Sequence, residues 1–117
     1  DWLKGKGHAN PVLLSHSLGS WMSAAYFRES ARPAFAAWIC LGLGVEFGDL
    51  RRVPGPILDV LGEKDLPAVL AGTERRRAAL AGIRGARQVT IAGADHHYNG
   101  RDGELAAVLV AFLGELK

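Results

Sequence analysis

The sequence predicts an α/β fold in which helices flank a mostly parallel sheet of about four strands. Two observations point to this fold class. Short apolar runs alternate along the chain with segments of helical periodicity, and glycine and proline residues separate the two kinds of segment. Strands joined through helices run parallel, with right-handed crossovers. The predicted strands are residues 11–15, 37–43, 56–61 and 88–91.

A change of periodicity marks the first strand and the first helix. Residues 11–14 form an apolar run suited to a strand that is buried on both faces. Helical spacing begins directly afterwards and predicts a helix over residues 18–29. The apolar stripe of this amphipathic helix, which ordinarily faces a core, would consist of Leu18, Trp21, Met22, Ala25 and Tyr26. The other side would consist of Ser20, Ser23 and Ala24.

Two further helices are predicted later in the chain. One covers residues 67–83 with an interruption at Gly72, and Thr73 is expected to cap its second part. The three adjacent arginines at 75–77 would spread around that helix and form a solvated surface. The last helix covers residues 103–115, with Asp102 as its expected N-cap.

Composition excludes several classes of function. The chain has 117 residues and a formal net charge of +2, and this length accommodates one domain at most. Its basic residues are scattered without interleaved aromatic residues, which argues against a nucleic-acid partner. The apolar stretches fall short of the ~20 residues that span a bilayer, so no membrane span is predicted. The single cysteine, Cys40, lies in an apolar run and is expected to be a buried strand residue.

The most informative motif is the segment LLSHSLGS, residues 13–20, which places Ser17 between the first strand and the first helix. A serine hydroxyl is a weak nucleophile, so its use requires a tight turn that exposes Oγ and a base within hydrogen-bond reach. The free N–H groups at a helix start carry the positive end of the helix dipole and can receive an oxyanion. The N–H of Leu18 is the natural first donor. Small residues beside the serine, here Ser15 and Gly19, are expected because the turn is crowded.

This segment resembles the α/β-hydrolase family, whose nucleophile elbow commonly reads G-H-S-L-G where this chain has S-H-S-L-G. The resemblance extends to two later segments. ILDVLGEKD, residues 57–65, looks like the family's next-to-last core strand with the loop that carries the catalytic acid. VTIAGADHH, residues 89–97, looks like the last strand with the histidine loop. The chain is also similar to a bacterial subgroup of uncharacterised α/β-hydrolase-like proteins, in which G-E-x-D and a late G-A-D-H followed by an aromatic residue recur.

The resemblance implies a triad in the family's order of serine, acid and histidine. Ser17 would be the nucleophile, Asp65 the acid and His96 the base. Each follows the carboxyl end of a predicted strand, and the loops at that edge of a doubly wound sheet converge on one crevice. The expected chemistry is acyl transfer to water.

Alternatives remain for the base. His97 competes with His96, although it stands where the family often has an aromatic residue. His16 occupies a position that usually packs against the elbow, and His8 is expected to be exposed. Adjacent histidines on a loop diverge, and no spaced cluster of ligands accompanies them, so neither a metal site nor a cofactor is predicted.

Alternatives also remain for the acid. Glu63 precedes Asp65 by two residues, and Glu46 and Asp49 follow the preceding strand, where some members of this fold place the acid. We expect the last two to be solvated loop residues. Asp59 lies within a strand, where burial of an unpaired carboxylate is costly, so we expect it to be hydrogen-bonded or at an edge.

The resemblance covers only the C-terminal part of the family fold. Residues 1–117 would form the C-terminal part of one α/β-hydrolase domain, without the N-terminal strands and the loop that supplies the second oxyanion donor. The expected function is hydrolysis of a small carboxylic ester or thioester through an acyl-enzyme, in the complete protein only. The alternatives are a catalytically incompetent module for binding or assembly, and an acyltransferase that uses the same triad.

Overall fold

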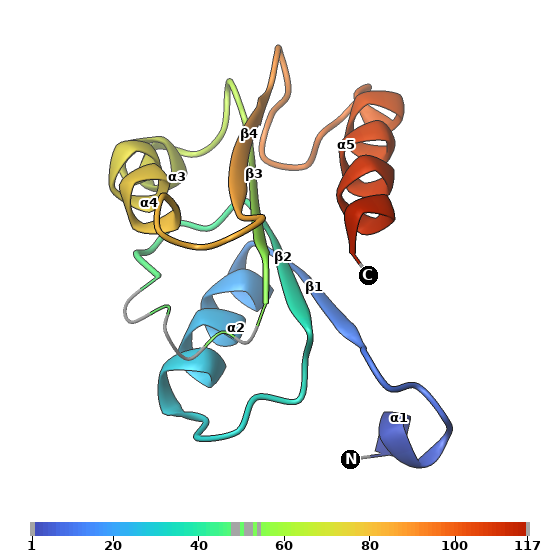
Figure 1. The fold of residues 1–117 in the computed structure, drawn as a ribbon. Helices are drawn as coiled ribbons and strands as arrows, with labels where there is room; N and C mark the ends of the chain where they lie inside the picture. Colours follow the sequence, from blue (N-terminus) through green and yellow to red (C-terminus); the bar gives the residue numbers. More distant parts are fainter. Residues whose placement is uncertain (1, 48–49, 51–52, 54, 117) are drawn as a thin grey trace.

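Four parallel strands form one sheet in the order β1-β2-β3-β4 (Figure 1). The computed structural model describes residues 2–47, 50, 53 and 55–116. The strands are β1 (Val12–His16), β2 (Ala37–Leu41), β3 (Ile57–Gly62) and β4 (Arg87–Ile91). The predicted parallel sheet is therefore confirmed, with β2 ending two residues earlier than expected because Gly42 takes a positive φ of 61° and turns the chain.

Five helices occur in the described part of the chain: α1 (Trp2–Gly5), α2 (Leu18–Glu29), α3 (Pro67–Ala71), α4 (Thr73–Leu80) and α5 (Asp102–Glu115). The bounds of α2 match the prediction, and the break between α3 and α4 falls at Gly72 as expected. The sequence pattern missed α1.

Two capping predictions were wrong. Asp102 is the first residue of α5 and makes no side-chain cap bond, although its carboxylate lies in the first turn, where the helix dipole favours negative charge. Thr73 is the first residue of α4, and its hydroxyl donates back to the carbonyl oxygen of Val69 at 3.3 Å. Thr73 therefore joins α4 to α3.

The helices lie on both faces of the sheet (Figure 1). Helices α2, α3 and α4 lie on one side, where a core cluster includes Phe27 of α2, Trp38 and Cys40 of β2, and Leu80 of α4. Helix α5 lies on the other side, where Phe112 packs into a second cluster. Both faces of β2 are thus covered, as its uninterrupted apolar sequence requires.

Helix α2 faces the core with its serine side and with only part of its apolar stripe, since Tyr26 packs against the first core cluster while the first residues of the stripe are exposed. Leu18, Trp21 and Met22 are 62%, 52% and 67% exposed, whereas Ser20 and Ser23 face the core together with Ala24 and Phe27. Serines are tolerated there because each hydroxyl has a nearby acceptor: Ser20 donates to the carbonyl of Leu41 at 3.0 Å, and Ser23 to that of Gly19 at 2.8 Å. Their small side chains let the helix lie close to the sheet.

A fully buried ion pair joins α4 to β3. Arg76 Nε donates to Asp59 Oδ2 at 2.9 Å, and neither side chain has any exposed surface. Gln88 of β4 donates to the same carboxylate oxygen at 2.8 Å. The expectation that Asp59 is hydrogen-bonded is confirmed. The expectation of a solvated arginine run was wrong for Arg76, because Asp59 provides a buried partner that helical spacing alone cannot reveal.

Arg75 and Arg77 do lie on the solvated surface, where they pair with Glu46 and Glu74.

We expect Arg76→Met to lower the free energy of unfolding by about 3–5 kcal/mol, because it leaves the buried Asp59 carboxylate without its cation. Arg75→Met and Arg77→Met remove exposed ion pairs and should each change it by less than ~1 kcal/mol. Urea unfolding of the three variants measures the difference, and equal losses would contradict a structural role for the buried pair.

Candidate active site

Ser17 occupies a strained turn between β1 and α2. Its backbone has φ 56° and ψ −119°, a conformation that a residue with a β-carbon rarely adopts. The Ser17 N–H donates to the carbonyl of Leu41 in β2 at 2.9 Å, which anchors the turn to the sheet. Sharp strand-to-helix turns of this kind present the serine Oγ at the top of the sheet.

The structure brings Ser17, His96 and Asp65 together in one hydrogen-bonded chain. His96 Nε2 lies 2.7 Å from Ser17 Oγ, and His96 Nδ1 lies 2.6 Å from Asp65 Oδ1. The three residues come from loops after β1, β3 and β4, which meet because the carboxyl ends of parallel strands share one edge of the sheet. An ionised carboxylate only accepts hydrogen bonds, so we assign the ring proton to Nδ1, which leaves Nε2 to accept from the Ser17 hydroxyl.

Backbone donors hold the Asp65 carboxylate in position. The N–H of Gly62 donates to Oδ2 at 2.9 Å, and the N–H of Leu66 donates to Oδ1 at 2.8 Å. Asp65 is buried, so these bonds replace the water that the carboxylate loses. The carboxylate is thereby fixed with one oxygen directed at the His96 ring.

The rival bases are not part of this hydrogen-bonded chain. His97 is exposed, and its ring centroid lies 5.2 Å from that of His96. His8 is exposed as expected and precedes β1, at the opposite end of that strand from Ser17. Among the described residues, His96 is the histidine that bonds both to a carboxylate and to the Ser17 hydroxyl.

The rival acids are also separate from the histidine. Glu63 is exposed, Glu46 pairs with Arg75 on the surface at 2.6 Å, and Asp59 is occupied by Arg76. Asp49 lies outside the described residues.

Two interactions shape the loop that carries His96. Asp95 closes a turn by accepting the backbone N–H groups of His97 and Asn99 at 3.0 and 3.1 Å and the Asn99 side-chain amide at 2.9 Å. These hydrogen bonds, the one from the Asn99 side chain first, lower the pKa of the Asp95 carboxyl. From the other side, His16 Nε2 donates to the His96 carbonyl oxygen at 2.8 Å. His16 therefore packs at the elbow, as the resemblance implies, and also holds the histidine loop.

Two glycines that the sequence analysis missed make room for the site. A β-carbon on Gly42 would lie 2.8 Å from Cε1 of the His96 ring, and the residue has a positive φ. A β-carbon on Gly62 would lie 2.3 Å from the carbonyl oxygen of Ala94. The available signal was a glycine at the end of each of two buried strands, directly after β2 for Gly42 and as the last residue of β3 for Gly62, at the edge where the loops converge.

The two small residues beside Ser17 have different roles. Ser15 replaces the usual glycine, and its Oγ accepts the buried indole N–H of Trp38 at 3.0 Å. The expected crowding at Gly19 is not observed, since a β-carbon there would lie 3.8 Å from Cβ of Ser15, an ordinary contact. Ser15 therefore gives the buried Trp38 indole a partner that glycine could not provide.

Cys40 is no rival nucleophile. It is fully buried in β2, and burial, followed by the nearby Asp59 charge, raises the pKa of its thiol well above the ordinary value. The thiol is therefore neutral and closed to a substrate.

A pocket of about 320 Å³ opens beside Ser17 and His96. Its walls come from the start of α2, the loop after β2, and α3. The Leu18 N–H is the first of α2 and has no acceptor within the helix, so it remains a donor at this end of the pocket. An oxygen bound near Ser17 would meet this partial positive charge.

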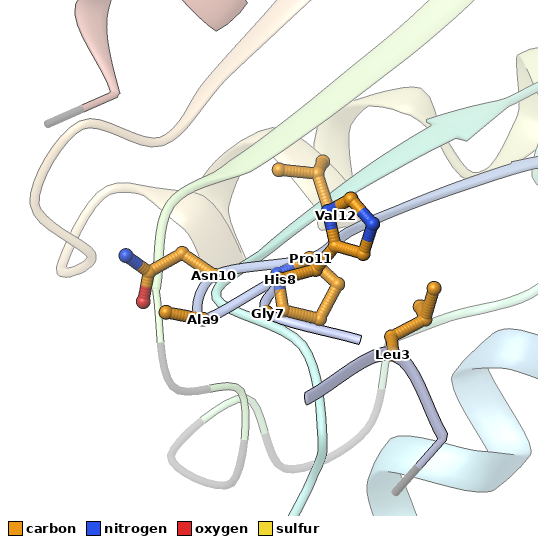
Figure 2. A pocket seen from close by; sticks show the side chains of 7 residues that line it. All are labelled: Leu3, Gly7, His8, Ala9, Asn10, Pro11 and Val12. Atoms are coloured by element: carbon orange, nitrogen blue, oxygen red, sulfur yellow. The ribbon is translucent and has the colours of Figure 1, made fainter. Parts of the chain in front are cut away.

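A second hollow, of about 480 Å³, lies at the amino end of β1 (Figure 2). It is lined by Leu3 and residues 7–12, among which His8 is the one titratable side chain. Because β1 runs from Val12 toward Ser17, this hollow is at the opposite end of the strand from the hydrogen-bonded chain. It lacks a nucleophile and a second titratable partner for His8.

Two kinds of feature are absent from the described residues. No helix there combines the length and the apolar character needed to cross a membrane. No cluster of three or more His, Cys, Asp or Glu side chains in the same part of the chain has a geometry that could hold a metal ion.

Comparison with solved structures identifies the fold. A predicted CIB-like hydrolase from Thermoplasma acidophilum matches 98% of this chain with a TM-score of 0.73 and 22% identity. An α/β serine hydrolase homologue from Coxiella burnetii matches 94% with a TM-score of 0.72 and 23% identity. The match covers 56% and 52% of those two chains, so this chain spans about half their length. No family model and no curated protein matches the chain. Over the part that it spans, the chain has the α/β-hydrolase fold.

Proposed function

We propose that the chain carries the catalytic triad of a serine hydrolase, with Ser17 as nucleophile, His96 as base and Asp65 as acid. The single observation that supports this most is the unbroken hydrogen-bonded chain from Ser17 Oγ through both nitrogens of the His96 ring to Asp65 Oδ1. A structural role would not require the serine at this end to adopt a strained backbone that presents its hydroxyl at the carboxyl edge of the sheet.

The proposed reaction proceeds through an acyl-enzyme. Ser17 Oγ attacks the substrate carbonyl while His96 Nε2 takes the hydroxyl proton, and the Leu18 N–H stabilises the oxyanion. Asp65 keeps the ring in the required tautomer and stabilises the imidazolium. His96 then gives the proton to the leaving alcohol or thiol. A water molecule, activated by the same nitrogen, releases the acid and restores Ser17.

We further propose that residues 1–117 are the C-terminal part of a longer hydrolase domain. This chain covers little more than half of each matched structure, and in this fold the second oxyanion donor comes from an earlier loop. The loss of one such donor typically costs about 10²- to 10³-fold in rate. Full activity toward carboxylic esters or thioesters would then require the complete domain.

The nucleophile is tested by labelling the complete protein with a fluorophosphonate probe. We expect labelling of the parent protein and none of Ser17→Ala, with hydrolysis of a short acyl ester lowered by at least about 10³-fold, because Ser17 carries the hydroxyl that bonds to His96. Ser30→Ala, at the other end of α2, is the matched control and should label normally. Labelling of Ser17→Ala at the parent's level would refute the assignment. Acyl products formed with an added alcohol in preference to water would instead identify a transferase.

The base is tested by replacing the two adjacent histidines separately. We expect His96→Ala to lose at least about 10³-fold in kcat, because the proton acceptor of Ser17 is removed. His97→Ala should retain activity within about threefold, since its ring is exposed. Both rates are measured with the same short acyl ester, and loss of activity in His97→Ala alone would reverse the assignment.

The space beside the base is tested at Gly42. Gly42→Ala places a methyl group within 2.8 Å of the His96 ring, so we expect the ring to move and kcat to fall by about 10²-fold or more. Gly7→Ala is the matched control, because Gly7 also has a positive φ but a β-carbon there meets nothing within 4 Å. Equal activity of the two variants would show that His96 does not depend on this contact.

A further inference from the structure

We infer that the pocket beside Ser17 binds an uncharged, apolar group of the substrate, and that the small residues Gly44 and Ala68 leave the space that a longer group needs. This inference rests on the proposed function, since it concerns the same site. The substrate class follows from the chemistry of the pocket walls, and the role of the two residues in specificity follows from the space around Gly44.

The pocket has no charged wall. Among the described residues that line it, all except Ser17 and His96 are glycine or apolar, and they include Leu18 and Trp21 of α2 and Leu66, the residue before α3. The nearest acidic side chain along the loop, Glu46, is exposed and paired with Arg75 at 2.6 Å. A carboxylate or ammonium group that entered the pocket would lose its hydration and would meet no charged side chain among these lining residues, whereas an alkyl group would gain by leaving water.

The volume restricts the size of the group. At about 320 Å³ the pocket is at the lower end of the ~300–1,000 Å³ range that is typical for small-molecule sites. It opens directly at Ser17 Oγ, so a group attached to the reacting carbonyl can enter while the carbonyl stays within reach of the hydroxyl. Alkyl groups of short to medium length meet both conditions.

Gly44 lies where the loop after β2 meets α3. A β-carbon at this position would lie 3.5 Å from Cβ of Ala68 and 4.0 Å from Cγ2 of Val69, both ordinary contacts. A larger side chain would therefore be accommodated by the fold and would extend into the pocket that these three residues line. Glycine at 44 and alanine at 68 keep this part of the pocket open.

The opposing wall cannot retreat to restore the lost space. Val69 is buried, and its carbonyl oxygen accepts a hydrogen bond from Nη2 of Arg76 at 3.0 Å. Arg76 is itself held by the buried Asp59 carboxylate. Asp59 of β3 thus holds α3 in place beside the pocket through Arg76. A side chain added at residue 44 must therefore occupy space that the substrate would otherwise fill.

The test compares Gly44→Val with Gly82→Val, a matched change at a glycine where a β-carbon meets nothing within 4 Å. Hydrolysis by the complete protein is measured with 4-nitrophenyl esters whose acyl chain grows from acetyl to decanoyl, and separately with acetate esters of alcohols of growing length. Each buried methylene contributes about fourfold to kcat/KM, and valine excludes roughly two or three of them. We expect Gly44→Val to lower kcat/KM for the eight-carbon member relative to the two-carbon member by roughly 15- to 60-fold in one of the two series, with Gly82→Val unchanged.

The series that responds identifies whether the acyl or the alcohol part enters the pocket. A hemisuccinate ester, which has a terminal carboxylate, should be hydrolysed at least about tenfold more slowly than the butyryl ester of similar length. Ala68→Leu narrows the pocket from the helix side and should give the same shift, so a folding defect in Gly44→Val does not leave the test undecided.

Different results would overturn the pocket assignment and the serine hydrolase proposal. If fluorophosphonate still labels Ser17 and acetate is still hydrolysed, but neither Gly44→Val nor Ala68→Leu changes the dependence on chain length, the pocket assignment is overturned and the hydrolase proposal stands. If acetyl hydrolysis does not depend on Ser17, both are overturned.

Discussion

The buried ion pair between Asp59 and Arg76 constrains the packing around β3. A carboxylate without exposed surface in the middle of a sheet is tolerable only with a partner, and Arg76 reaches it from α4 at 2.9 Å. The same guanidinium donates to the carbonyl of Val69, so it also holds α3. Gln88 adds a bond from β4. The ion pair and its hydrogen bonds thus connect β3, β4, α3 and α4. The loop that carries Asp65 follows β3 directly.

The candidate site depends on this packing because each of its residues lies beyond a strand end. Gly62 closes β3 and donates its N–H to Asp65, while its missing side chain lets the backbone of Ala94 approach from the histidine loop. The strain at Ser17 is offset by the bond from its N–H to the carbonyl of Leu41. A strained turn persists only where the surrounding structure fixes it. Here the pairing of β1 with β2 fixes the strand side, and the hydrogen bond from Ser20 Oγ to the Leu41 carbonyl fixes the helix side.

The sequence alone predicted the features that depend on a local residue pattern. It did not predict the contacts that depend on a residue far away along the chain. The parallel sheet and the bounds of α2 follow from periodicity and turn residues. The resemblance to the α/β-hydrolase family singled out Ser17, Asp65 and His96, and their positions after strands led us to expect them to meet. Arg76 could not be separated from its two arginine neighbours, because its partner is 17 residues away on a strand. The sequence also did not reveal that Gly42 leaves room for the His96 ring, because a glycine after a strand ordinarily indicates only a turn. The roles of the three convergent residues in catalysis remain predictions.

Helix α2 shows that the apolar side of a helix need not face the core along its whole length. Periodicity predicts which side of a helix is apolar, but it does not say what covers that side. Here Ser20 and Ser23 face the sheet because nearby carbonyl groups accept from their hydroxyls, which removes the usual cost of burying a polar side chain. The apolar side is then free to face elsewhere, and Leu18 and Trp21 line the pocket at Ser17. A helix that begins at a nucleophile presents its first turns to whatever binds there, so under the proposed function Leu18 and Trp21 contact the substrate while Tyr26, later in the same stripe, packs against the core.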